Sequence, residues 1–102
     1  MKTSVRLLLA ATAVVAAAAV AQAECVTKAG KGTGGTDDSA KFQAWEAVLQ
    51  ATDWTSWGAW MVSSTSTIGQ APGYRVTNVK TRCEAGGMLG RQCRIQAKLC
   101  KV

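Results

Sequence analysis

The sequence predicts an α+β protein in which one amphipathic helix packs on a two- or three-stranded antiparallel sheet, stapled by two disulfides. Three observations predict this fold. Apolar residues recur at helical spacing after residue 40, two alternating runs flank a glycine-rich loop near the C-terminus, and four cysteines lie in only 102 residues. A domain this short buries a small fraction of its surface, so covalent cross-links are expected to support its core.

Residues 1–23 have the features of an export signal. Lys2 and Arg6 precede an alanine-rich apolar run over 7–20, and Ala21-Gln22-Ala23 fits the small-x-small pattern of a cleavage site. The apolar run is short for a bilayer, whose hydrocarbon core takes about 20 predominantly apolar residues to cross. We therefore expect a periplasmic or secreted protein without a transmembrane anchor after cleavage.

All four cysteines follow this signal. An even number of cysteines in a short exported chain predicts two disulfides, and they are drawn from Cys25, Cys83, Cys93 and Cys100. The chain has no histidine and no C-x-x-C pair, so zinc, haem attachment and thioredoxin-like chemistry lack their usual spacing. We expect no metal and no cofactor.

The segment 24–37 is predicted to be a flexible, glycine-rich N-terminal arm, and 38–102 a single small globular domain. The arm has four glycines between residues 30 and 35 and no apolar periodicity. Its lysine precedes most of the glycines, which does not fit the phosphate-binding P-loop pattern. Asp37, Asp38 and Ser39 supply oxygens that can cap a following helix.

An amphipathic helix is predicted to follow these caps and to end between residues 52 and 55. At 100° per residue, the apolar or small side chains that share one face are Phe42, Trp45, Val48, Leu49 and Thr52. A longer helix would place Trp54 and Trp57 on its polar side, which is why it should end there.

The next segment, about 57–67, is predicted to be an extended strand because it is rich in aromatic, β-branched and hydroxyl residues. A short second helix is the alternative, since Trp54, Trp57 and Trp60 recur at helical spacing. Residues 69–73 form a turn.

A β-hairpin is predicted for the C-terminal part. Residues 74–83 alternate, with Val79 and Cys83 on one face and Tyr74 and Val76 on the other. After a glycine loop at 84–90, the residues on one face of the second strand are Cys93, Ile95, Ala97 and Leu99, and those on the other are Arg94, Gln96 and Lys98.

Folding the hairpin about Gly87 and Met88 places Cys83 opposite Cys93, which leaves Cys25 to bond with Cys100. A shift of register would instead favour Cys83 with Cys100 and Cys25 with Cys93, and the sequence leaves both pairings open.

The order of these features resembles a loose family of small exported cysteine-containing proteins of alphaproteobacteria. The residues that carry the resemblance are Trp45 with Val48 or Leu49, then Trp54, Trp57 and Trp60, then Cys83, Cys93 and Ala97-Lys98-Leu99-Cys100. Leu99 stands where that pattern has proline. The resemblance implies export and this build, and it implies no catalytic residues.

Charge is unevenly distributed along the chain. Residues 24–74 carry three bases and five acids, whereas residues 75–102 carry seven bases and Glu84 alone. One interpretation is a surface for anionic partners, and the other is a solvated strand face that prevents edge-to-edge pairing. The candidate binding surface combines these bases with the tryptophans, as Trp54, Trp57, Trp60, Arg75, Arg82, Arg91, Arg94 and Lys98. The alternative for the tryptophans is a place in the core.

No catalytic residues are predicted. The chain lacks histidine, and no base stands out that could activate a serine nucleophile. The sequence therefore favours an exported, non-catalytic binding or structural protein of the cell envelope, with an anionic envelope polymer or another protein as its partner and no nucleic acid. The alternative function is a secreted inhibitor or cationic antimicrobial effector that acts through the basic C-terminal hairpin.

Overall fold

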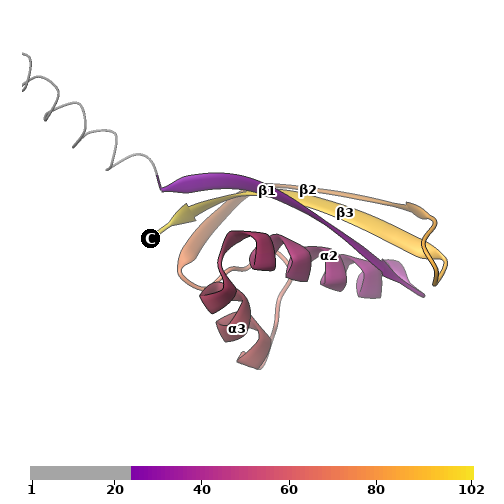
Figure 1. Ribbon diagram of the computed structural model, residues 1–102, viewed down its shortest axis with the longest axis horizontal. Coiled ribbons are helices and arrows are strands. Elements are labelled where there is room, and N and C mark those ends of the chain that lie inside the picture. Colours follow the sequence, from indigo (N-terminus) through magenta and orange to yellow (C-terminus); the bar gives the residue numbers. More distant parts are fainter. Residues whose placement is uncertain (1–23) are drawn as a thin grey trace, which may run out of the picture.

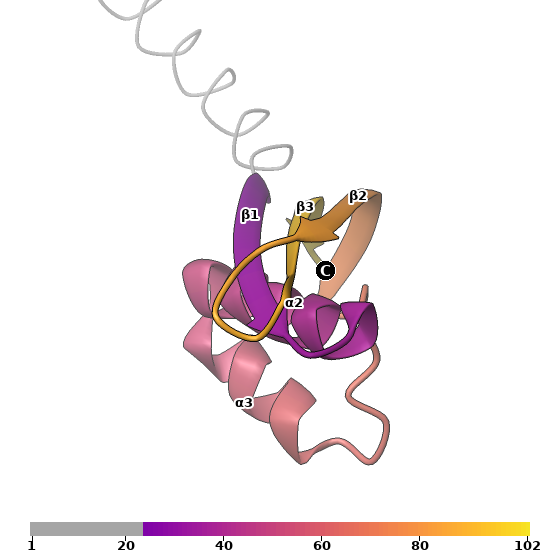
Figure 2. The same ribbon diagram turned by 90° about the vertical axis from the view of Figure 1, so that its right-hand side faces the viewer.

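A computed structural model describes residues 24–102, so the predicted export signal at 1–23 lies outside the described residues. The elements, in chain order, are β1 (Cys25–Gly34), α2 (Asp37–Thr52), α3 (Trp54–Val62), β2 (Tyr74–Ala85) and β3 (Arg91–Lys101). The strands form one antiparallel sheet in the order β1-β3-β2, and both helices lie on one face of it (Figures 1 and 2). The predicted α+β fold is confirmed. The sheet has three strands, and there are two helices where one was predicted.

The prediction of a flexible arm at 24–37 is wrong for most of that segment, because residues 25–34 form the edge strand β1. This strand pairs with β3 over its whole length, from Cys25 opposite Cys100 to Gly34 opposite Arg91. The folded domain therefore includes residue 25 and does not begin at residue 38.

The glycines of β1 have a packing role. Gly30, Gly32 and Gly34 alternate along the strand and are all buried on its helix-facing side. A Cβ atom added to Gly32 would overlap the backbone of Ala40 and Ala44 in α2. Glycine here allows a strand and a helix to approach more closely than any side chain would permit.

The N-cap of α2 is Thr36, and of the predicted capping residues only Ser39 takes part in the cap. The Thr36 hydroxyl accepts a hydrogen bond from the Ser39 backbone N–H at 3.2 Å, and the Ser39 hydroxyl accepts one from the Thr36 backbone N–H at 3.2 Å. This reciprocal pair is a capping box. Asp37 and Asp38 occupy the first turn, where negative charge is favourable near the helix N-terminus.

The predicted end of this helix near residue 52 is confirmed, but the strand predicted at 57–67 is wrong, because α3 begins directly after the break. The Asp53 backbone N–H donates to the Leu49 carbonyl at 2.8 Å, and the Asp53 carboxylate accepts from the Thr55 backbone N–H at 2.8 Å. One residue thus ends α2 and caps α3. The helical alternative prevails because it also turns Trp60 into the core. None of the helices within residues 24–102 combines the length and apolar character needed to cross a bilayer.

The hairpin of β2 and β3 has the predicted register at its cysteines, where Cys83 lies opposite Cys93. The predicted faces of β2 are wrong, because a bulge interrupts the alternation between Thr77 and Lys80. Asn78 adopts a left-handed conformation with φ of 55°, which asparagine tolerates better than most residues. As a result Cys83 lies on the helix-facing side together with Tyr74 and Val76, which were predicted to lie on the opposite face from it. Val79, which was predicted to share a face with Cys83, is 44% exposed.

The core lies between α2 and the central strand β3. The predicted alternation of β3 is confirmed, since Cys93, Ile95, Ala97 and Leu99 are all buried on the helix-facing side. They pack with the buried apolar residues of the helices, which are Ala40, Ala44, Trp45, Val48, Leu49 and Trp60. No helix of the described chain covers the other side of the sheet (Figure 1).

Candidate functional site

The four cysteines form two disulfides, one on each face of the sheet. Cys83 and Cys93 are joined on the helix-facing side, and Cys25 and Cys100 are joined on the opposite side, where Arg94 and Lys98 also point. Of the two predicted pairings, the structure has Cys83 with Cys93 and Cys25 with Cys100, in which each bond joins residues directly opposite in the sheet. It excludes Cys83 with Cys100. The Cys25–Cys100 bond closes a loop with a sequence separation of 75 and fixes β1 to the C-terminal strand.

Two of the tryptophans belong to the core. Trp45 is fully buried and its indole N–H donates to the Gln70 carbonyl at 2.8 Å. Trp60 is 1% exposed, and its indole N–H donates to the Thr67 carbonyl at 2.9 Å. Its ring lies 4.9 Å from that of Phe42. Trp60, a predicted binding residue, is therefore a structural one.

The other two tryptophans of α3 are less buried than Trp60. Trp57 is half-buried and donates its indole N–H to the Glu46 carboxylate at 3.1 Å. Trp54 is 64% exposed and meets Trp57 edge to face at 5.2 Å between ring centroids. Trp54 is the only one of the three candidate tryptophans with most of its surface exposed to solvent. The three tryptophans therefore do not form a shared aromatic platform.

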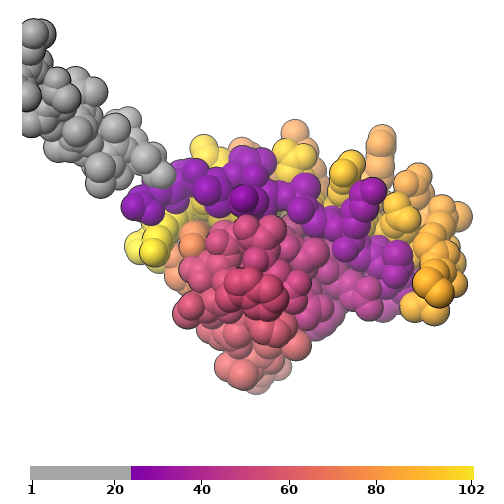
Figure 3. Space-filling view, in the orientation of Figure 1, coloured from indigo at the N-terminus to yellow at the C-terminus, as the bar shows by residue number. Residues whose placement is uncertain are grey.

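The uncovered side of the sheet gathers cationic side chains from all three strands. We call it the outer face, and its basic residues are Lys31, Arg75, Lys80, Arg82, Arg94 and Lys98. All six are exposed. Glu84 is the one acidic residue on the outer face of the described strands β1, β2 and β3. In Figure 3 long side chains project from the strands on the side away from the helices.

The predicted binding surface is therefore divided. Four of its bases, Arg75, Arg82, Arg94 and Lys98, share the outer face, while the candidate tryptophans belong to α3, which lies on the opposite side of the sheet (Figure 1). The sequence analysis did not single out Lys31 or Lys80 as site residues. Alternation within β1 could have identified Lys31, which lies between two buried glycines.

Arg91 is the predicted site residue that serves structure. Its Nε donates to a carboxylate oxygen of Asp37 at 2.6 Å, and this is the one ion pair within residues 24–102. That hydrogen bond lowers the pKa of the Asp37 carboxyl below its usual value and raises the pKa of the Arg91 guanidinium. The pair connects the first turn of α2 to the start of β3.

Asp53 and Tyr74 form a second polar link, between the helices and β2. The Tyr74 hydroxyl donates to the Asp53 carboxylate at 3.0 Å. The pKa of the Asp53 carboxyl is lowered, first by the Thr55 backbone N–H and then by this hydroxyl. The pKa of the Tyr74 hydroxyl is raised, mainly by burial and then by the adjacent carboxylate. Both groups have structural roles in this arrangement.

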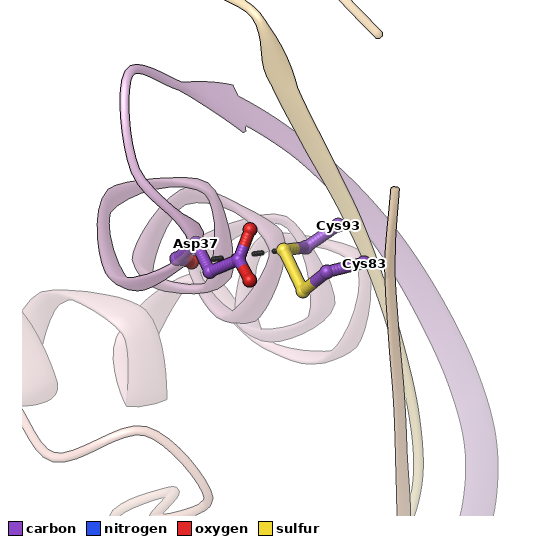
Figure 4. Close-up of side chains that lie close together, drawn as sticks. All are labelled: Asp37, Cys83 and Cys93. Carbon is purple, nitrogen blue, oxygen red and sulfur yellow. Dashed lines mark hydrogen bonds between the residues drawn. A yellow bond between two sulfur atoms is a disulfide. The ribbon is translucent and has the colours of Figure 1, made fainter. Parts of the chain in front are cut away.

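Asp37 also lies beside the Cys83–Cys93 disulfide (Figure 4). The sulfur of Cys93 is 3.6 Å from the Asp37 backbone carbonyl oxygen. An oxidised sulfur has no proton to donate, so we treat this approach as packing. The three residues are close enough to bind a metal ion together. Cysteine binds metal as a free thiolate, however, and here the two sulfurs are bonded to each other.

A shallow hollow of about 400 Å³ opens between α3, the loop at 63–73 and the start of β2. Its lining includes Trp60, Thr65, Gln70 and Tyr74, and it carries no charged side chain. The polar groups of Trp60 and Tyr74 are already bonded to Thr67 and Asp53, so they offer little to a ligand. The outer face is the stronger candidate.

No protein-family model matches the chain, and searches of curated proteins and of solved structures gave no match. The resemblance to small exported proteins of alphaproteobacteria stays a prediction. The outer face and its charges are the main indication of function in the described chain.

Proposed function

We propose that this protein is an exported, non-catalytic binding protein of the cell envelope whose outer face holds an anionic polymer. The observation that carries the proposal is the placement of six exposed bases on one uncovered sheet face. None of these bases is paired with a carboxylate within residues 24–102, where the ion pair is that of Arg91 with Asp37. Their charges are therefore available to a ligand.

The shape of the face suits an extended ligand. β3 has 11 residues, which corresponds to a length of about 36 Å at roughly 3.3 Å per residue. The bases are distributed along this length, from Arg75 near one end to Arg94 near the other. A linear polymer with repeated negative groups can contact several of them at once, and the attraction should weaken as salt screens it.

The same face argues against single-stranded nucleic acid as the ligand. Proteins that hold such strands combine basic grooves with aromatic side chains on which bases stack. On the outer face of the described strands, the neighbours of the bases are threonine, glutamine and alanine, with no aromatic ring. An acidic polysaccharide needs charge and hydrogen bonds but no stacking surface, so it fits the composition better.

Retention on immobilised alginate, an acidic polysaccharide, tests the proposal. The variant Lys80→Gln/Lys98→Gln removes two outer-face charges, and Lys41→Gln/Lys101→Gln removes two charges from other surfaces. We expect the first variant to elute at clearly lower salt than the second, although both have the same net charge. Equal elution of the two variants would show that only net charge matters and would refute the proposed site.

A second candidate function is supported by one observation at the hairpin tip. Met88 is 98% exposed and Leu89 is 63% exposed between two cationic strands. An apolar tip flanked by bases is suited to insertion into an anionic membrane or into the cleft of a target enzyme. Leakage from phosphatidylglycerol vesicles that disappears in Met88→Ser/Leu89→Ser would favour this effector function over polymer binding.

A further inference from the structure

We infer that Lys31, Arg94 and Arg82, which form a row across the three strands, make a subsite for a tetrahedral dianionic oxyanion such as a phosphoryl group. We call these three residues the cation row. The inference rests on the proposed function, because it assigns the most specific contact of the polymer to one place on the outer face.

The register places these three side chains side by side. Lys31 lies directly opposite Arg94, and Arg82 lies directly opposite Arg94 from the other side. Directly opposed residues of an antiparallel pair have Cβ atoms about 4.5–5.5 Å apart, and like charges at such positions are destabilising. Other positions on β3 avoid this conflict, since Lys98 lies between Thr27 and Thr77. The cation row therefore has an unfavourable arrangement that an anion would relieve.

The surface is hollowed at this row. A depression of about 150 Å³ is lined by Lys31, Arg82, Arg94, Gln92 and Glu84. A water molecule occupies about 30 Å³ in the liquid, so the depression corresponds to roughly five waters. Phosphate and sulfate have five heavy atoms each. The hollow therefore has room for one tetrahedral oxyanion together with water.

The chemistry of the lining favours a dianion over a carboxylate. The guanidinium groups of Arg82 and Arg94 present planar forks that match two oxygens each, and the Lys31 ammonium adds a compact charge. Gln92 contributes an amide that can donate a hydrogen bond. Including Glu84, the lining has a net charge of +2, which is opposite to that of a phosphomonoester dianion. A carboxylate has two oxygens and one charge, so it neutralises less of the lining than a dianion with three or four oxygens.

The test is a titration of the purified protein with sodium phosphate, sodium sulfate and sodium acetate at constant ionic strength, followed by the NMR signals of the arginine Nε–H groups. We expect phosphate and sulfate to saturate and acetate to bind at least tenfold more weakly. Arg94→Gln should weaken phosphate binding by about tenfold or more, as loss of a charge-assisted hydrogen bond implies. Lys98→Gln, on the same strand and face, should change it by less than about twofold. Lys31→Gln repeats the test from another strand should Arg94→Gln fail to fold.

Acetate binding as tight as phosphate, or equal losses in Arg94→Gln and Lys98→Gln, would overturn the subsite. Either result would leave polymer retention untouched, and alginate retention that depends on Lys80 and Lys98 would still support the proposed function. Glucose 6-phosphate and phosphatidylcholine vesicles with phosphatidic acid distinguish the sources of the group. Binding of the sugar phosphate supports a polysaccharide ligand, and binding of the vesicles alone supports a lipid headgroup. Absence of binding to both would contradict the inference.

Discussion

The two faces of the sheet are made from the same strands and have opposite physical roles. On β3, Ile95 and Leu99 are fully buried against α2, whereas their neighbours Arg94 and Lys98 are exposed on the outer face. The helix-facing side is so close-packed against α2 that the buried residues of β1 are all glycines. The outer face instead places like charges side by side. One face supplies stability, and the other gives up some stability for available charge.

The disulfides follow the same division. Cys83–Cys93 supports the packed side, while Cys25–Cys100 joins the edge strand to the centre from the open side. Four experiments test the contrast between the faces.

The largest effect is expected from removing the outer-face disulfide. Cys25→Ala/Cys100→Ala should lower the free energy of unfolding by about 4 kcal/mol, because the bond closes a loop with a sequence separation of 75 and restricts the unfolded chain. Urea unfolding without reductant measures the change. The neighbouring outer-face pair gives a control, and Thr27→Ala/Lys98→Ala should change stability by less than about 0.5 kcal/mol. A loss below about 1 kcal/mol in the cysteine variant would contradict the contribution assigned to the disulfide.

The next effect concerns the close approach of β1 and α2. Gly32→Ala should lower the free energy of unfolding by about 1–3 kcal/mol, because the added methyl group would overlap helix backbone and force the two elements apart. Thermal and urea denaturation measure it. Gly35→Ala is the matched control, since an added Cβ there meets no atom within 4 Å. Similar stability of both variants would refute the packing role of the β1 glycines.

A smaller effect of opposite sign is expected on the outer face. Arg94→Gln should raise the free energy of unfolding by about 0.2–1 kcal/mol in the absence of anions, because it removes the central charge of the cation row. Lys98→Gln should leave it nearly unchanged, since its direct neighbours are threonines. Destabilisation by Arg94→Gln would show that the row is a structural feature.

The smallest effect is the dependence of stability on acid. The pKa values of Asp37 and Asp53 are lowered in the folded protein, so between the folded and unfolded pKa values the unfolded chain binds more protons. Their contribution is complete above the unfolded value near 3.8 and decreases as the pH falls through the lower folded values. In Asp37→Asn the melting temperature should decrease less between about pH 4 and pH 2 than it does in the unmodified protein. An unchanged slope would exclude a stabilising link between Asp37 and Arg91.

Much of the local structure could be predicted from patterns of a few residues. The end of α2 follows from the change of apolar phase near Thr52, and the buried side of β3 follows from strict alternation. Folding the hairpin about its glycine loop indicated Cys83 opposite Cys93 as one of two open pairings, and the structure has that register.

Some of the errors arise because a deciding contact is distant in sequence, and others because a local conformation has no clear signal in the pattern. Glycines in β1 indicate flexibility when they are considered alone, and they become a packing surface only beside Ala40 and Ala44. The helical state of 54–62 depends on a cap from Asp53 and on Trp60 reaching the core. The bulge at Asn78 brings Cys83 to the same side of β2 as Tyr74 and Val76 and leaves Val79 exposed.

By itself the sequence determined the α+β class, the alternating C-terminal strand, the cysteines available for disulfides and the excess of bases in the last third of the chain. These features depend on residue type and short-range periodicity. Only the tertiary structure decided that Lys31 joins Arg82 and Arg94 in one row, that Arg91 is used for an ion pair, and that Trp60 is buried. The physical reason is that the pairing between strands determines which charges become neighbours, and the sequence of one strand does not specify which strand it pairs with or in which register.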